Sequence, residues 1–243
     1  MLPHPPLSSH YHNSEAKLEF VKQLFNCGAK YYDFVEDLGS FRTGSWYRRS
    51  VLQRHGLRPG QRLLDVACGT GLVAAEAMKI LGSAENITCL DPSEGMLAVA
   101  RTRLPARFVC AWAEHIPLPD DSFEFLTMGY ALRHVVDLEE AFREYRRVLS
   151  SGGRLLILEI TKPARPISRF MFRSYFGHVF PFLALVLTRS RDARDMVRYY
   201  WETMDACVPP ARVLEAMRSS GLREVKCSTR FQLFTEYSAV KPG

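Results

Sequence analysis

Apolar residues recur at two different spacings along the chain. Between residues 15 and 58 they follow a helical period, as in Leu18, Val21, Leu24 and Phe25. From residue 59 onward, short apolar runs alternate with amphipathic helical stretches. The runs predict strands at 62–66, 87–90, 107–110, 123–128 and 155–159, and the stretches predict helices at 72–81, 93–103 and 138–149. This alternation predicts a parallel sheet with helices on both faces and right-handed connections.

The pattern changes again after Lys162-Pro163. Residues 167–188 are aromatic and aliphatic with scattered basic residues, and 192–206 and 209–219 are helical. Two late strands, 224–228 and 234–240, are predicted to close the sheet as an antiparallel pair. We therefore expect an α/β fold with a doubly wound, mostly parallel seven-stranded sheet, an N-terminal helical lid and a helical insertion before the last strands. The predicted organisation is a flexible tail (1–14) and a single domain (15–243), which comprises N-terminal helices (15–58), a strand–helix core (59–162), covering helices (163–206) and a C-terminal helix with strands (207–243).

Composition and charge narrow the class of protein. Of 243 residues, 47% are hydrophobic and 24% are charged, as in ordinary globular domains, and the formal net charge is +6. Basic clusters at 42–49, 143–147 and 189–198 are either solvated helix faces or a surface for anionic phospholipid or nucleic acid. Residues 1–10 lack the apolar core of a secretory signal, and the longest apolar run, 179–187, is shorter than the roughly 20 residues of a membrane span. We expect a cytoplasmic protein, soluble or peripheral to a membrane.

The strongest chemical signal is the run LLDVACGTG at residues 63–71. It takes a strand through a glycine turn into a helix, where Gly69 and Gly71 let the backbone approach a ligand and the helix start offers free N–H groups. Gly69-x-Gly71-x-x-Ala74 also fits a dinucleotide fingerprint. Asp65 favours another ligand, because its carboxylate suits an ammonium group and repels a pyrophosphate. The helices before the first strand also differ from a typical dinucleotide domain.

A second acidic residue follows the next strand. Asp91 lies at the edge of the sheet where ligands of doubly wound folds bind, and its carboxylate suits a ribose diol. The sequence Asp91-Pro92-Ser93 also suits a helix cap, and both interpretations hold together if Ser93 is the cap. None of the six cysteines lies in a C-x-x-C pair, so no metal site is predicted.

These segments resemble class I methyltransferases, and more narrowly the UbiE-type ubiquinone/menaquinone biosynthesis C-methyltransferases. The resemblance covers most of the chain from about Lys30. It is carried by residues 30–33 (KYYD), 64–71 (LDVACGTG), 91–97 (DPSEGML), 113–120 (AEHIPLPD), 131–135 (ALRHV), 147–149 with 152–154, 158–159, 162–163 and 178–181 (HVFP).

The resemblance implies a Rossmann-like methyltransferase domain that binds S-adenosyl-L-methionine in the core and covers its substrate with the helices of residues 163–206. Asp65, Gly69 and Gly71 would hold the methionine part of the cofactor, Asp91 the ribose hydroxyls, and Met96, Ala113 and Glu114 would lie at the adenine. Tyr32 would belong to the N-terminal lid. The full set of implied cofactor residues is Tyr32, Asp65, Ala67, Gly69, Gly71, Asp91, Pro92, Met96, Trp112, Ala113, Glu114 and Gly129.

Three residues are candidates for catalysis. Arg133 follows the fourth strand and would stabilise negative charge on a phenol-type acceptor, while His134 or His178 would accept its proton. Each of the three also has a non-catalytic interpretation. Arg133 would be an ordinary surface charge, and each histidine would be a surface or core residue.

Three departures from the family pattern bear on the substrate. Trp112 replaces a small polar residue, His134 replaces the asparagine of Leu-Arg-Asn-Val, and residues 234–240 replace a glycine-rich strand that bears a histidine. We therefore expect methylation of a small aromatic, quinol- or phenol-type acceptor at carbon or oxygen. The alternatives are methylation of a natural product such as a polyketide, and N-methylation of a lipid headgroup. The expected partners are an aromatic or lipid-like small molecule, a membrane surface beside the aromatic segment 170–187, and a second copy in a homodimer; a nucleic acid is not expected.

Overall fold

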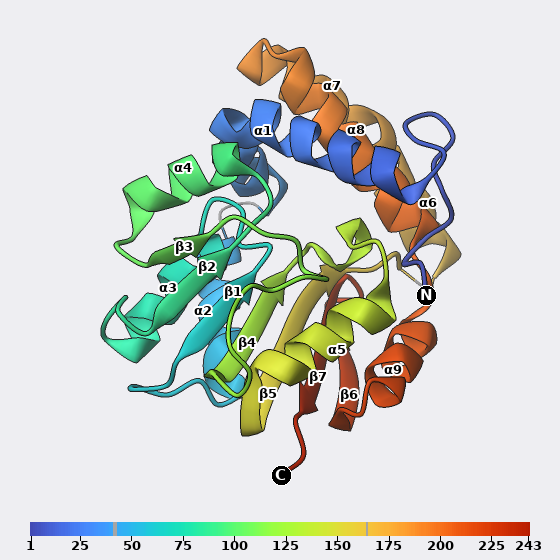
Figure 1. The fold of residues 1–243 in the computed structure, drawn as a ribbon. Helices are drawn as coiled ribbons and strands as arrows, with labels where there is room; N and C mark the ends of the chain where they lie inside the picture. Colours follow the sequence, from blue (N-terminus) through green and yellow to red (C-terminus); the bar gives the residue numbers. More distant parts are fainter. Residues whose placement is uncertain (41–42, 164) are drawn as a thin grey trace.

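The structure is a computed structural model that describes residues 1–40, 43–163 and 165–243. Within these residues, seven strands form one sheet in the order β3-β2-β1-β4-β5-β7-β6 (Figure 1). The strands are β1 (Leu63–Val66), β2 (Ile87–Leu90), β3 (Arg107–Val109), β4 (Phe123–Gly129), β5 (Leu149–Ile160), β6 (Arg223–Arg230) and β7 (Phe234–Val240). Strands β1 to β5 are parallel, and β7 is antiparallel to both β5 and β6. This confirms the predicted doubly wound α/β fold with its late antiparallel pair.

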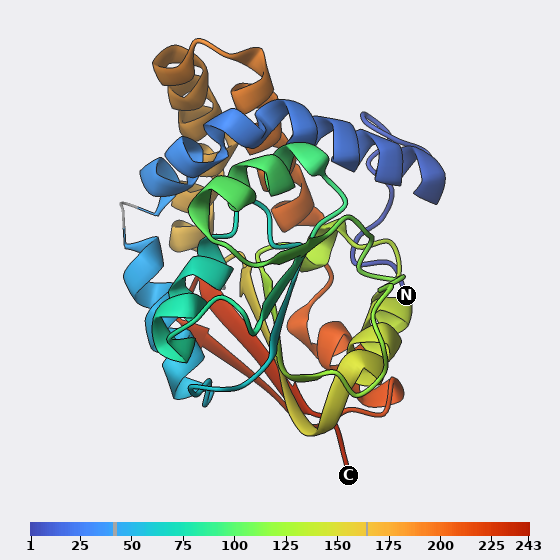
Figure 2. The same ribbon diagram turned by 60° about the vertical axis from the view of Figure 1, so that its left-hand side comes forward.

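Helices cover both faces of the sheet and its upper edge (Figures 1 and 2). On one face lie α2 (Gly44–Arg54), α3 (Leu72–Leu81) and α4 (Glu94–Arg103), and on the other lie α5 (Leu138–Val148) and α9 (Pro210–Ser219). Over the edge lie α1 (Ser14–Gly39), α6 (Pro166–Ser174), the π-helix η2 (Tyr175–Val179), α7 (Phe180–Thr188) and α8 (Arg191–Ala206). The short 3₁₀ helix η1 (Leu132–His134) follows β4. The predicted lid and helical insertion therefore meet above the sheet.

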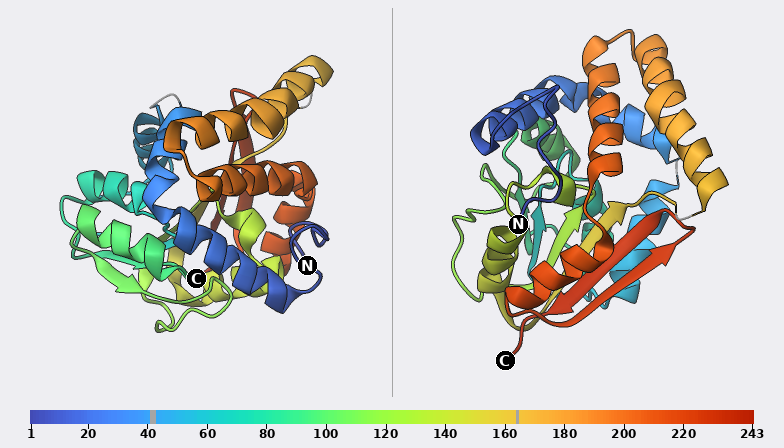
Figure 3. Two further views of the ribbon diagram at one scale, coloured as in Figure 1. Left: turned by 90° about the horizontal axis from the view of Figure 1, so that it is seen from above. Right: turned by 90° about the vertical axis from the view of Figure 1, so that its right-hand side faces the viewer.

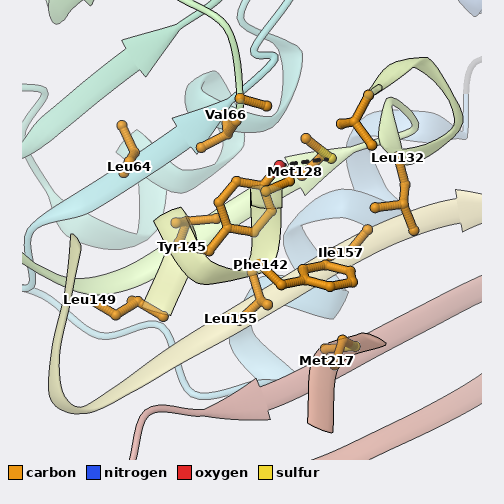
Figure 4. Packing of buried hydrophobic residues seen from close by; sticks show 14 of the residues in the cluster. Leu64, Val66, Met128, Leu132, Phe142, Tyr145, Leu149, Leu155, Ile157 and Met217 are labelled. Carbon is orange, nitrogen blue, oxygen red and sulfur yellow. Dashed lines mark hydrogen bonds between the residues drawn. The ribbon is translucent and has the colours of Figure 1, made fainter. Parts of the chain in front are cut away.

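Alternation along the strands builds a separate core on each face. In β1, Leu63 packs with α2 and α3, whereas its neighbour Leu64 packs with α5 (Figure 4), because successive side chains of a strand point to opposite faces. In the core of Figure 4, Tyr145 of α5 is fully buried, and its hydroxyl donates to the Met128 sulfur at 3.8 Å. The parallel strands are thus apolar on both sides, as expected of a sheet covered by helices on both faces.

Strand β5 is longer than the sequence predicts. It begins at Leu149 rather than at Leu155, and its register with β4 shifts between Phe123 and Phe125. Gly152 has a φ of 75°, which glycine adopts at little cost, so the strand passes through a bulge where the sequence indicates a turn.

The N-terminal residues differ from the predicted flexible tail. Tyr11 and His4 are buried, and the Tyr11 hydroxyl lies 3.3 Å from the hydroxyl of Tyr199 in α8. The Val208 amide donates to the Pro3 carbonyl at 2.8 Å. These residues form a strap between α8 and the loop before α9, and no local pattern indicates it because the partners lie about 200 residues away in sequence.

Candidate active site

Two adjoining cavities lie at the carboxyl-terminal edge of the sheet, beyond the ends of β1, β2 and β4. The strand order reverses here, and ligands of doubly wound sheets bind at this point. The larger cavity comprises about 640 Å³ and the smaller about 300 Å³, and both volumes include space that is open to solvent. Tyr32, Ala67, Gly129 and Tyr130 line both, so the two form one continuous site.

The glycine turn after β1 forms the floor of the larger cavity. Gly69 and Gly71 have φ angles of 56° and 80°. A Cβ on Gly71 would lie 2.9 Å from the Cδ2 of Leu104, so Gly71 permits close packing against the end of α4. A Cβ on Gly69 would meet no atom within 4 Å, which leaves the space beside this backbone free for a ligand. The two glycines thus differ in their surroundings: Gly71 packs against the end of α4, and Gly69 borders open space in the cavity.

Asp91 faces the same cavity from the end of β2. Its Oδ2 accepts a hydrogen bond from the Gly69 amide at 2.8 Å, and its Oδ1 accepts one from the Ser93 amide at 2.9 Å. Ser93 is the N-cap of α4, because its hydroxyl accepts from the Met96 amide at 3.1 Å. Burial raises the pKa of Asp91 to about 6. The cap therefore belongs to Ser93, and Asp91 shapes the glycine turn while its carboxylate lines the cavity.

The smaller cavity contains two buried groups of opposite charge. The Oδ1 of Asp65 accepts from the Thr127 hydroxyl at 2.8 Å, but its Oδ2 has no hydrogen-bond partner among the described residues. Burial raises the pKa of Asp65 to about 7. Across the same cavity, Arg48 pairs with Glu36 at 2.6 Å, while its Nε has no partner in the part of the chain that the structure describes. A zwitterion with one ammonium and one carboxylate matches this pair of groups.

The remaining residues implied at the cofactor also come together. All of the twelve except Gly71 line one of the two cavities. Pro92, Met96, Trp112, Ala113 and Glu114 stand around the larger one with Asp91. The Glu114 carboxylate accepts from the Val136 amide, which fixes the loop after η1. The structure shows that these residues are neighbours; that they bind a cofactor remains a prediction.

Helix α1 closes this site from above. Asp33 accepts a hydrogen bond from the Thr70 hydroxyl at 2.6 Å, and the Asn26 side chain accepts from the Gly95 amide at 2.9 Å. Further along, Lys17 is buried and its ammonium donates to the backbone after η1. Burial lowers the pKa of Lys17 to about 8. The lid is thus tied to the glycine turn, to α4 and to η1.

His134 forms part of the aromatic wall of the larger cavity. Its ring stacks on Tyr199 at 5.4 Å between centroids, and Phe25 of α1 meets it edge-on at 5.2 Å. Both ring nitrogens are buried, and neither has a hydrogen-bond partner among the described residues. Burial, followed by the positive charges of Arg133 and Lys17, holds the pKa of His134 well below its usual value. The imidazole is therefore neutral at pH 7 and has two unused polar atoms.

Arg133 does not line either cavity. It is buried, and its Nη1 pairs with the Glu159 carboxylate at 2.5 Å and also donates to the Tyr130 carbonyl at 2.8 Å. Its Nε donates to the Thr203 hydroxyl at 3.1 Å, and its guanidinium lies 5.3 Å from the ring centre of Tyr200. Tyr130 and Tyr200 do line the cavity, so Arg133 positions them from behind. This geometry does not favour the direct contact between Arg133 and the acceptor that the sequence predicts.

His178 lies apart from the site. It is exposed in η2 and lines neither cavity. Sequence reasoning also missed Arg48 and Tyr200. Arg48 belongs to one of the basic clusters, but nothing in its local pattern separates it from a surface charge. Tyr200 lies on α8, whose helical pattern shows which face is apolar but not that this face meets a cavity.

Comparisons with known proteins show the family of the chain. The model of the ubiE/COQ5 methyltransferase family matches residues 12–234. Among curated proteins, the chain is similar to the ubiquinone/menaquinone biosynthesis C-methyltransferase UbiE of Shewanella sp. strain W3-18-1, with 34% identity over 187 residues, or 74% of each chain. The protein of the same name from Shewanella oneidensis is 33% identical over the same share of both chains.

Solved structures of lower identity share the fold. A SAM-dependent methyltransferase from Aquifex aeolicus has a TM-score of 0.62 at 17% identity and covers 86% of this chain and 97% of its own. Phosphoethanolamine N-methyltransferase 2 from Haemonchus contortus, in complex with S-adenosyl-L-methionine, has a TM-score of 0.58 at 18% identity and covers 81% of this chain and 52% of its own.

Proposed function

The chain belongs to the ubiE/COQ5 methyltransferase family and is an S-adenosylmethionine-dependent methyltransferase, and we propose that it methylates a small phenol- or quinol-type aromatic acceptor at carbon or oxygen. The observation that carries the proposal is His134. A neutral imidazole with two unpaired ring nitrogens lines an aromatic cavity beside the glycine turn. An acceptor hydroxyl would supply the hydrogen bond that this buried group lacks.

The residues of the site fit the cofactor. Asp65 would hold the ammonium and Arg48 the carboxylate of its methionine end, while Asp91 would accept from the ribose hydroxyls. Met96 and Trp112 would flank the adenine. When bound, the cofactor supplies a methyl group on a positively charged sulfur. The protein must hold this carbon and the acceptor in line and keep water away, and such positioning supplies much of the barrier lowering.

The acceptor's half of the cavity favours an aromatic molecule. Aromatic rings line this half of the cavity, from Phe25, Tyr32, His134 and Tyr200. Lys22 is the basic side chain among the lining residues. This lining supports a flat apolar acceptor more than a phosphorylated headgroup, which calls for a cluster of basic donors.

Positive charge around the site would activate the acceptor. Burial is the main cause of the lowered pKa of His134, and the positive charges of Arg133 and Lys17 lower it further because they disfavour an imidazolium. Glu159 offsets the charge of Arg133, but Lys17 forms no salt bridge among the described residues and would favour a phenolate. A phenolate is a better nucleophile than the neutral phenol at its oxygen and at the adjacent ring carbons. His134 would hold the acceptor hydroxyl by a hydrogen bond and, once the phenolate forms, donate its ring N–H to the oxygen and orient it. The phenol proton passes to solvent as the phenolate forms, because His134 binds a proton weakly.

The proposal places the enzyme in the cytoplasm, where it meets a lipid-like acceptor at a membrane surface. Quinols with long tails reside in the bilayer, so an enzyme that methylates their ring must approach the interface. The exposed apolar side chains of α6 and α7 support this placement.

The test is methyl transfer with labelled S-adenosylmethionine and three acceptors offered separately: a demethylated quinol, a polyketide phenol and phosphoethanolamine. We expect label on the quinol or the phenol. His134→Phe should lower kcat by roughly tenfold, because the acceptor loses one orienting hydrogen bond, and spare adenosylhomocysteine binding. His115→Phe is the matched control, because His115 is exposed outside the site. Label on phosphoethanolamine alone, or equal turnover of the two variants, would contradict the proposal.

A further inference from the structure

Helices α6, η2 and α7 form one continuous helix, Pro166–Thr188, that lies on the outside of the molecule beside α8 (Figure 3). It has 23 residues, and its most apolar window has a mean hydropathy of 1.4. By length and composition it is sufficient to cross a membrane, yet only 22% of that window is buried. The core helix of a soluble protein would be mostly buried, so this helix is unusual in what it exposes.

The helix has two distinct faces. Phe180 and Ala184 on its inner face are buried against Val35 of α1 and Met196 of α8. Its outer face is also apolar instead of polar, and Ile167 and Phe170 are 77% and 70% exposed. The other large apolar side chains exposed there are Met171, Val179, Phe182, Val186 and Leu187. Exposed apolar surface of this extent, gathered on one element, marks an interaction site.

Charge identifies the partner. The sequence from Ile160 to Arg191 contains no aspartate or glutamate. It contains six basic residues, Lys162, Arg165, Arg169, Arg173, Arg189 and Arg191, placed before, within and after the helix. Arg169, Arg173, Arg189 and Arg191 form no salt bridge among the described residues. An apolar face flanked by unpaired arginines is complementary to a bilayer that carries anionic headgroups.

A second copy of the chain is a poorer match for this face. A two-fold contact between identical helices would place the arginines of α6 against those that follow α7, without a carboxylate between them. A spanning orientation is also excluded for the folded chain. It would strip Phe180 and Ala184 from α1 and α8, and it would take Arg169 and Arg173 into the hydrocarbon.

We propose that the helix Pro166–Thr188 docks the protein on an anionic lipid bilayer. The helix lies in the interfacial plane, with its outer apolar side chains among the acyl chains and its arginines at the phosphates. Because α7 packs on α8 and contacts α1, docking brings Tyr200 and Phe25, two lining residues of the cavity, to the membrane side of the molecule. The inference concerns this surface and holds whichever acceptor the enzyme uses.

Vesicle flotation with the full-length protein, without cofactor or acceptor, tests the proposal. We expect binding to phosphatidylcholine vesicles that contain phosphatidylglycerol, weaker binding to phosphatidylcholine alone, and release by salt. Phe170→Glu/Phe182→Glu should lower the partition coefficient by about tenfold or more. The control is Phe231→Glu, because Phe231 is 72% exposed in the turn between β6 and β7 and is not part of this helix. Arg169→Gln/Arg173→Gln should reduce the preference for phosphatidylglycerol, since each basic residue near such a surface contributes about 1 kcal/mol.

Three results would overturn the proposal: no binding of the wild type to anionic vesicles, equal binding by the double glutamate variant, or a dimer in light scattering that the same variant abolishes. Circular dichroism and adenosylhomocysteine binding establish that each variant is folded. Methylation of a tail-less phenol in solution should be the same in the wild type and the surface variants. A failure of docking is therefore distinguishable from a failure of the proposed methyl transfer.

Discussion

Cofactor binding should depend steeply on pH because Asp65 must ionise to hold an ammonium group. Burial raises the pKa of Asp65 to about 7 in the free protein, and its Oδ2 has no partner among the described residues. Below pH 7 the carboxyl is mostly protonated, and the bound ammonium then loses its counter-charge. The apparent dissociation constant equals the intrinsic constant divided by the ionised fraction.

The size of the effect follows from the two buried carboxyls. With a pKa of about 7, the ionised fraction of Asp65 falls from roughly 0.9 at pH 8 to roughly 0.1 at pH 6, which weakens binding about tenfold. Asp91, with a pKa of about 6, is half-ionised at pH 6 and adds about a factor of two. In Asp65→Asn, cofactor binding at pH 8 should weaken by about 1.5–3 kcal/mol. Only the twofold pH dependence that Asp91 causes should remain in this variant.

Titration calorimetry with adenosylhomocysteine between pH 6 and 8 measures the pH dependence of the affinity and the loss of affinity in Asp65→Asn. The control is Asp91→Asn, which removes only the twofold pH dependence that Asp91 causes. An affinity that does not change over this pH range, or an Asp65→Asn variant that keeps the tenfold change in affinity, would refute the reasoning.

The pH dependence of the free energy of unfolding gives an independent check on the pKa of Asp65. Because the folded-state pKa is raised, Asp65 costs the free protein more stability as pH rises from about 4 to 7. Asp65→Asn should therefore be more stable than the wild type at pH 8 and equal to it below pH 4.

Two further predictions concern buried arginines. Arg48→Met should weaken binding of adenosylhomocysteine by roughly tenfold or more and leave its decarboxylated analogue unaffected; calorimetry that shows equal losses for both ligands would remove Arg48 from the carboxylate site. Arg133→Met should lower the free energy of unfolding by about 3–5 kcal/mol, because it leaves the Glu159 carboxylate buried without its partner, and Arg133→Met/Glu159→Leu should recover most of that loss. Urea denaturation measures both variants. The deficit of the single variant should shrink toward pH 4 as Glu159 takes up a proton, and a deficit independent of pH would contradict this account.

The parts of the site that could be predicted from sequence are those fixed by local backbone chemistry. The turn at Gly69 and Gly71 needs positive φ angles, and Asp91 ends a strand, so both positions follow from the pattern of strand, turn and helix. The same holds for the sheet, because alternating strands and helices admit few topologies. The resemblance to a known family then supplied the identity of the cofactor.

The parts that could not be predicted depend on partners distant in sequence. Arg133 follows β4 just as a substrate residue would, and only the folded chain shows that Glu159 on the neighbouring strand neutralises it. His178 lies in a segment that resembles the family, yet its helix turns it to solvent. Arg48 looks like any other surface charge until α2 places it in the smaller cavity. In each case the decisive contact has no local signal.

The position of β7 between β5 and β6 has a consequence for the newly made chain. The outer edge of β5 pairs with residues 234–240, and Val240 follows Ile160 by 80 residues. At about 5–20 residues per second, the ribosome needs roughly 4–16 s to supply this partner. During that interval the longest strand of the sheet has an open edge, and the apolar helix Pro166–Thr188 is made within the same interval. The unpaired strand edge and the apolar helix are therefore present together on the nascent protein, and both favour aggregation or chaperone binding at this stage of synthesis.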